Sequence, residues 1–150
     1  MLYDDLTIDG TVERIRKLAG FLHALPHNKK LNMSNWASHA RIGITENLCK
    51  TSACVAGWAT RVWPKELILQ DDSVVLKESL ESDWTVHGPE ALGVVLGITY
   101  EQSEAICYSR QSTPKRKARE LRKVAALFKK RGNIHNVSIP EIKEIMGRLS

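Results

Sequence analysis

One stretch decides the fold of this chain: Ala53-Cys54-Val55-Ala56-Gly57-Trp58-Ala59-Thr60-Arg61-Val62-Trp63. It predicts a helix that is apolar on nearly every side. Such a helix is typical of a protein interior, because a surface helix keeps one polar face toward water. Thr51 or Ser52 is the expected N-cap, and Pro64 ends the helix. We therefore expect the other elements to pack around this central helix.

Helical signals lie on both sides of the central helix. A first helix is expected from an N-cap at Thr11 to Pro26, with apolar residues recurring on one face. Further along, prolines near the first helical position and a capping box from Thr99 to Gln102 predict four more helices. These cover about residues 89–96, 100–108, 114–131 and 139–149.

A small β-hairpin is predicted between the central helix and the later helices. The apolar runs Leu67-Ile68-Leu69 and Val74-Val75-Leu76 flank the turn-forming cluster Asp71-Asp72-Ser73. Two strands alone are marginal, so the hairpin must lie on the helices. The expected fold is therefore mainly α, with α+β as the alternative. It is a single domain over residues 1–150, a bundle of five to six helices around the buried central helix.

The charge of the chain is unevenly distributed. Lys and Arg number 22 against 17 Asp and Glu, a net charge of +5. Between Arg110 and Arg131 there are ten basic residues and a single acid, Glu120, so this segment carries +9 and the other 128 residues sum to −4. A concentrated positive field attracts polyanions in a way that a uniform charge does not.

The basic segment is the leading candidate for a binding surface. Ala118, Leu121 and Phe128 belong to a predicted buried stripe, while basic residues cover the other sides of the helix. The candidate residues for binding a macromolecule are Arg110, Lys115, Arg116, Lys117, Arg119, Arg122, Lys123, Lys129, Lys130 and Arg131. The partner would be nucleic acid or an acidic protein. The alternative is neutralisation by the protein's own acids, such as Glu101 and Glu104. A helix-turn-helix over residues 89–131 is a weaker interpretation, because its turn lacks the usual glycine.

The number and spacing of the cysteines favour buried thiols over disulfides or a metal site. Three cysteines, at 49, 54 and 107, cannot all pair within one chain, and no secretory signal or membrane span is present, so we expect a cytoplasmic protein. Cys49 and Cys54 with His39 or His87 would form only part of a zinc ligand set. Buried thiols are the favoured interpretation, and no metal or cofactor is predicted.

A second candidate site lies before the central helix. His39, Cys49, Thr51 and Ser52 would border its N-terminus, where backbone N–H groups suit an anion and lower the pKa of a thiol. This pocket would belong to a small enzyme or a nucleotide- or anion-binding protein. The chain contains no Gly-x-x-x-x-Gly-Lys loop, no Gly-x-Gly-x-x-Gly and no Gly-x-Ser-x-Gly motif, so enzymatic function is the less favoured alternative.

Residues 49–59 carry a Cys-x4-Cys-x2-Gly-Trp-Ala signature that resembles a group of small bacterial and bacteriophage proteins of unknown function. Three further features are similar to that group: the Leu-rich helix at 18–25, Met33 with Trp36, and the Leu-Gly-Ile-Thr turn at 96–99. The resemblance implies a phage or mobile-element setting and no catalytic residues. We expect a non-enzymatic accessory protein that engages a host macromolecule in the host cytoplasm, where it would counter a host defence.

Overall fold

The computed structural model describes residues 7–24, 53–70, 73–110 and 112–147. This part of the chain holds six α-helices, two short 3-10 helices and one antiparallel hairpin, which confirms the mainly α prediction. The elements are α1 (Ile8–His23), α4 (Ala53–Val62), β1 (Leu67–Gln70), β2 (Ser73–Leu76), η1 (Lys77–Glu81), α5 (Pro89–Leu96), α6 (Tyr100–Cys107), α7 (Pro114–Arg131), η2 (Ile134–Asn136) and α8 (Ile139–Met146).

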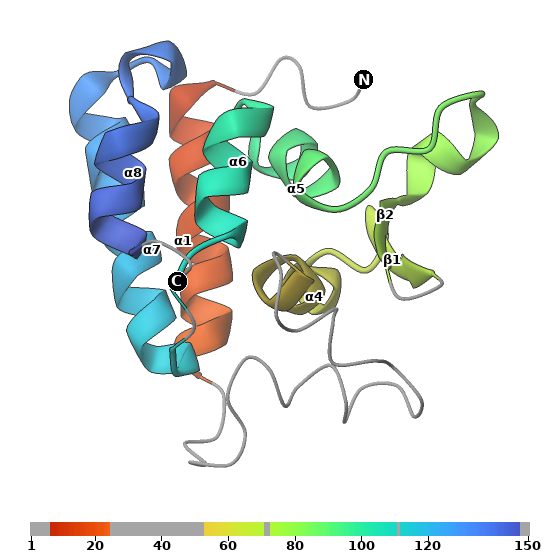
Figure 1. Ribbon diagram of the computed structural model, residues 1–150, viewed down its shortest axis with the longest axis horizontal. Helices are drawn as coiled ribbons and strands as arrows, with labels where there is room; N and C mark the ends of the chain where they lie inside the picture. Colours follow the sequence, from red (N-terminus) through yellow and green to blue (C-terminus); the bar gives the residue numbers. More distant parts are fainter. Residues whose placement is uncertain (1–6, 25–52, 71–72, 111, 148–150) are drawn as a thin grey trace.

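The two longest described helices, α1 and α7, run antiparallel side by side (Figure 1) and form the most extensive helix–helix contact. Each buries one apolar stripe, as the 3.6-residue period requires. The stripe of α7 is the predicted one, and all its members are 0% exposed: Ala118, Leu121, Val124, Ala125 and Phe128. On the other side of the core, α8 packs on α6 and α7, and α6 packs on α4 and α5.

The predicted central helix, α4, contacts α1, α5, α6 and both strands. Its Trp58 is 3% exposed, and Phe21 of α1 packs on that ring with centroids 6.0 Å apart. Trp63, just beyond the helix, is 4% exposed and lies beneath the Arg14 guanidinium, 5.5 Å from the ring centroid. The apolar stretch therefore joins the α1–α7 pair to the hairpin, while the largest helix contact is made elsewhere, between α1 and α7.

The hairpin lies at the opposite end of the molecule from α7 (Figure 1). Its register runs from Leu67 opposite Leu76 to Gln70 opposite Ser73, so the hairpin forms from the two predicted runs, but Ser73, expected in the turn, belongs to β2. Leu67 and Leu76 are each 1% exposed, and the strands pack on α4 and α5. The helices thus supply the support that two strands alone lack.

Two predicted helix ends are wrong. The first helix begins at Ile8, because Thr7 is the N-cap and its Oγ1 accepts a hydrogen bond from the Gly10 N–H at 3.1 Å. The predicted cap, Thr11, is instead buried in the helix, where its hydroxyl donates to the Gly97 carbonyl. The last helix ends at Met146 rather than near 149. Pro26 and the predicted caps Thr51 and Ser52 lie outside the described residues.

Gly93 of α5 lies close to α6, and this contact gives a stability prediction. A Cβ at Gly93 would lie 3.2 Å from Ser103 Cβ and 3.4 Å from the Ile98 carbonyl oxygen. We expect Gly93→Val to lower the free energy of unfolding by about 1–3 kcal/mol, because the larger side chain overpacks this contact. A Cβ at Gly20 of α1 would meet nothing within 4 Å, so Gly20→Ala should raise stability by up to about 1 kcal/mol. Urea denaturation checks both variants, and a stable Gly93→Val would show that α5 can move away from α6.

Candidate polyanion-binding surface

Helix α7 has well-defined ends that set the direction of its side chains. Thr113 is the N-cap, and its Oγ1 accepts a hydrogen bond from the Arg116 N–H at 3.2 Å. Pro114 follows at the first helical position, and Gly132 ends the helix with a φ of 73°, a left-handed conformation that favours glycine. Between these ends α1 and α8 cover part of the helix, and basic residues occupy most of the exposed side.

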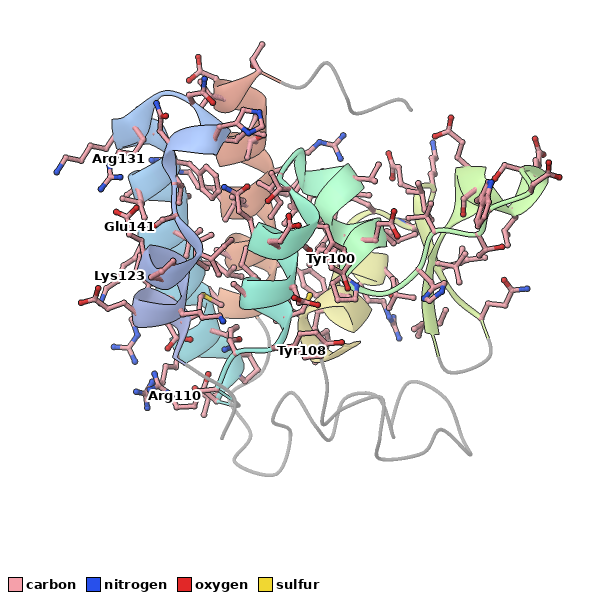
Figure 2. All side chains as sticks on the ribbon, turned by 45° about the horizontal axis from the view of Figure 1, so that its top comes forward. Tyr100, Tyr108, Arg110, Lys123, Arg131 and Glu141 are labelled. Atoms are coloured by element: carbon pink, nitrogen blue, oxygen red, sulfur yellow. The ribbon has the colours of Figure 1, made fainter. Side chains whose placement is uncertain are left out.

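Six basic side chains of α7 are exposed and form no ion pair within the described residues. We call these six residues the α7 cation surface: Lys115, Arg119, Arg122, Lys123, Lys129 and Lys130. Figure 2 shows Lys123 on the edge of the molecule formed by α7 and α8. The cation surface carries six positive charges with no described counterion, which makes it the strongest candidate site among the residues that the structure describes.

The remaining basic residues of the segment are paired. Glu120, whose side chain is 7% exposed, faces three cations: Arg110 Nη2 lies 2.9 Å from Oε2, Arg116 Nε 3.8 Å from Oε2, and Lys117 Nζ 3.2 Å from Oε1. Because one carboxylate serves three cations, this cluster keeps a net charge of +2. Arg110 and Arg116 are about half exposed, at 45% and 52%, so their charges still reach solvent.

The prediction that Lys117 belongs to the binding surface is wrong, because its side chain is only 2% exposed. Its ammonium donates hydrogen bonds to Ser109 Oγ at 2.8 Å and to the Arg110 carbonyl at 2.7 Å, besides the ion pair with Glu120. Three partners compensate the desolvation that a buried charge suffers. Lys117 therefore fastens the segment before α7 to the helix and is not available to a macromolecule.

The Arg110 side chain lies directly against Gly147, where a larger residue would not fit. Gly147, just after α8, has a φ of +79°, and a Cβ there would lie 2.9 Å from Arg110 Cβ. The backbone at Gly147 thus passes directly against the Arg110 side chain, which turns toward Glu120. Arg110 lies at the end of the molecule where α7 begins (Figure 2). Both the close approach and the left-handed backbone favour glycine at this position.

Arg131, at the other end of α7, is paired with Glu141 of α8 through two hydrogen bonds. Figure 2 shows the two side chains near each other at the α7–α8 edge. Glu141 also accepts from the Ser138 N–H at 3.0 Å and from the Ser138 hydroxyl at 2.9 Å, as part of a capping box. These bonds, the Ser138 backbone bond first, lower the pKa of Glu141 from 4.5 to about 2.

The lowered pKa of Glu141 predicts an acid-sensitive contribution to stability. A carboxyl whose folded-state pKa is depressed stabilises the protein above its unfolded pKa and loses that contribution as pH falls through the folded value. We expect wild type to melt above Glu141→Gln near neutral pH, and the difference to close between pH 4.5 and about 2. Thermal melts across that range check it. A difference independent of pH would mean that ionisation of Glu141 does not stabilise the fold.

The acids expected to neutralise the basic helix are placed elsewhere. Within the described ranges neither Glu101 nor Glu104 forms an ion pair with α7. The Glu104 carboxylate instead accepts a hydrogen bond from the Tyr100 hydroxyl at 3.0 Å, on the exposed side of α6. The neutralisation that the structure does show comes from Glu120 and Glu141. It accounts for Arg110, Arg116, Lys117 and Arg131, and no described acid pairs with the α7 cation surface.

Exposed aromatic rings of the described residues lie away from α7. Trp84 is 82% exposed in the segment after η1, Tyr100 is 47% exposed on α6, and Tyr108, which follows α6, is 38% exposed (Figure 2). The aromatic residue of α7, Phe128, is 0% exposed. The cation surface therefore offers charge and hydrogen-bond donors without a platform on which an unpaired base could stack.

The second predicted site falls outside the described residues, since His39, Cys49, Thr51 and Ser52 all lie in the undescribed part of the chain. The pocket stays a prediction. Cys107 is 4% exposed, and burial raises its pKa to about 12, so it is a thiol of the core. Among the described residues no three His, Cys, Asp or Glu side chains gather in a way that could hold a metal ion.

The helix-turn-helix interpretation fits the packing poorly. Helix α7 has α1 and α8 as its main partners, whereas a helix-turn-helix would pack α6 directly on α7. No described helix has the length and apolarity needed to cross a membrane. Comparison with protein-family models, curated proteins and solved structures finds no significant match for this chain.

Proposed function

We propose that this protein is a non-enzymatic binding protein that engages a polyanionic host macromolecule, nucleic acid or an acidic protein, through the α7 cation surface. One observation carries the proposal: six exposed cations lie on one helix without a counterion among the described residues. Concentrated charge of one sign raises the local concentration of oppositely charged partners and their association rates.

The cation surface has a cost for the free protein, and this supports a role in binding. Arg119 lies three or four residues from Lys115, Arg122 and Lys123, and each such like-charge pair destabilises a helix by about 0.2–0.5 kcal/mol. Lys115 also lies near the positive end of the helix dipole. A polyanion would supply the missing negative charge and remove these repulsions.

The biological setting rests on the resemblance of the Cys-x4-Cys-x2-Gly-Trp-Ala signature to small bacterial and bacteriophage proteins. We propose accordingly that the protein acts in the host cytoplasm and comes from a phage or a bacterial accessory genome. Countering a host defence is the role that this setting suggests. That role is drawn by association with the setting, and the binding chemistry stands without it.

A titration with polyanions tests the proposal. Fluorescent duplex DNA, duplex RNA and poly-glutamate are each titrated with the protein at about 50 mM and about 200 mM salt. We expect at least one of them to bind at low salt, with an affinity that falls steeply at the higher salt. If none of the three binds at low salt, the surface is not a polyanion site and the proposal fails.

A further inference from the structure

We infer that the binding surface continues onto α1 through Arg16, and that its partner is a double-stranded nucleic acid held by its phosphate backbone. This inference rests on the proposed function and narrows it to one class of polyanion. It depends on two observations: which sides of α1 and α7 the rest of the protein leaves open, and which side chains those open sides carry.

The open side of α1 follows from its contacts. Arg14 donates to the Val95 carbonyl of α5 at 3.2 Å and lies over Trp63, so this side of α1 faces α4 and α5. Arg16 comes two residues later, about 200° further around the helix axis. Arg16 therefore leaves α1 on the side away from α4 and α5, and its side chain is exposed.

The open side of α7 follows in the same way. Arg131 pairs with Glu141, so this side of α7 faces α8. Arg122 lies nine residues before Arg131, which places it about 180° around the axis. Lys115 lies seven residues before Arg122 and shares its side of the helix. Because α8, α6, α4 and α5 pack on one another, they cover the same side of the α1–α7 pair. Arg16, Arg122 and Lys115 therefore all belong to the opposite side.

The antiparallel pairing brings Arg16 and Arg122 to similar positions along the axis of the helix pair. Arg16 is the ninth of the 16 residues of α1, and Arg122 is the ninth of the 18 residues of α7. The two helices run past each other along their length (Figure 1), so both residues lie near the middle of the pair. Asp9 and Glu13 share the open side of α1 and are exposed, but both lie before Arg16, toward the end of the pair that carries Lys129 and Lys130. The positive charge is thus most concentrated from Arg16 and Arg122 toward Lys115.

This surface fits a duplex better than a single strand. Single-strand binding combines positive charge with exposed aromatic rings, and the exposed rings of the described residues lie on α6, directly after α6 and after η1 instead. A duplex carries one negative charge about every 1.7 Å of its axis. Four residues of a helix advance about 6 Å along its axis, so cations four residues apart are separated by about that distance. Such cations would meet phosphates wherever the protein lies along the duplex. The expected binding is therefore tight only at low salt and nearly independent of base sequence.

The test compares two single variants with the same change in charge. Arg16→Glu alters the proposed surface, and Lys77→Glu alters an exposed lysine of η1, beside the hairpin. Each variant and the wild type are titrated with a short duplex DNA, with one of its strands, and with poly-glutamate. We expect Arg16→Glu to weaken duplex binding about five- to tenfold and to make the log–log salt slope shallower by about 0.9. Lys77→Glu should change binding less than about twofold, and both variants should melt like the wild type.

The outcomes separate this inference from the proposed function. Equal losses for Arg16→Glu and Lys77→Glu, with duplex binding by the wild type, would overturn the part assigned to α1. If the single strand or poly-glutamate binds as tightly as the duplex, the inference that the partner is a duplex is overturned, while the proposed polyanion-binding surface stands. Absence of binding to every probe would overturn the proposed function and this inference together.

Discussion

Replacing Lys117 by glutamate is expected to unfold the protein or to lower its free energy of unfolding by about 3–5 kcal/mol or more. The variant would place two carboxylates side by side in a buried cluster, because Glu120 is 6% exposed. It would also leave Ser109 Oγ and the Arg110 carbonyl without the ammonium that donates to them. Domains are stable by only about 5–15 kcal/mol, so such a loss is large.

A lysine two positions away provides the control for Lys117. Lys115 is exposed at the start of α7, so Lys115→Glu should change stability by no more than about 0.5 kcal/mol. A glutamate there would even favour the N-terminal end of the helix dipole. Urea denaturation followed by circular dichroism separates the two variants. Equal stability would mean that the ion pair and hydrogen bonds of Lys117 do not hold the segment before α7.

The second large effect concerns binding. Replacing Lys115, Arg119 and Arg122 together by glutamate should abolish duplex binding at low salt, because the change reverses the most concentrated part of the α7 cation surface. The melting temperature should stay close to that of the wild type, since all three side chains are exposed and off the buried stripe.

A matched triple variant controls for net charge. Lys65, Lys77 and Lys143 are exposed outside α7, and replacing them by glutamate changes the net charge of the chain by the same amount. This control should retain most of the affinity for duplex DNA. If both triple variants lose binding equally, the affinity depends on the overall charge of the protein and α7 has no special part in it.

Much of the fold was predictable because local signals agreed with the final packing. Apolar residues at helical spacing, Thr113 with Pro114, and Gly132 predict α7 with its observed ends. The capping box at Thr99 likewise predicts the start of α6. Thr7 and Thr11 are equally good caps in isolation. The tertiary structure distinguishes them, because Thr11 is buried and its hydroxyl donates to the carbonyl of Gly97, far along the chain.

The site was less predictable, because burial of a charge depends on tertiary contacts. Residue type alone assigns Lys117 to the surface, although it precedes Leu121 by four residues and Val124 by seven, which places it on the buried stripe. That spacing, with the single acid of the segment three residues later, was the signal that could have identified a buried pair. The role inferred for Arg16 had no such signal, because it depends on how α1 lies against α7.

The salt dependence of duplex binding tests the central claim most directly. The affinity of the wild type and of a Lys115→Ala, Arg119→Ala, Arg122→Ala variant is measured over a series of salt concentrations, and log affinity is plotted against log salt. Each phosphate contact contributes about −0.9 to the slope on duplex DNA, so the variant should be shallower than the wild type by nearly three such contacts. Alanine favours helix, so the fold should be retained. Two parallel lines would contradict the account, because they would show that these cations neutralise no phosphate.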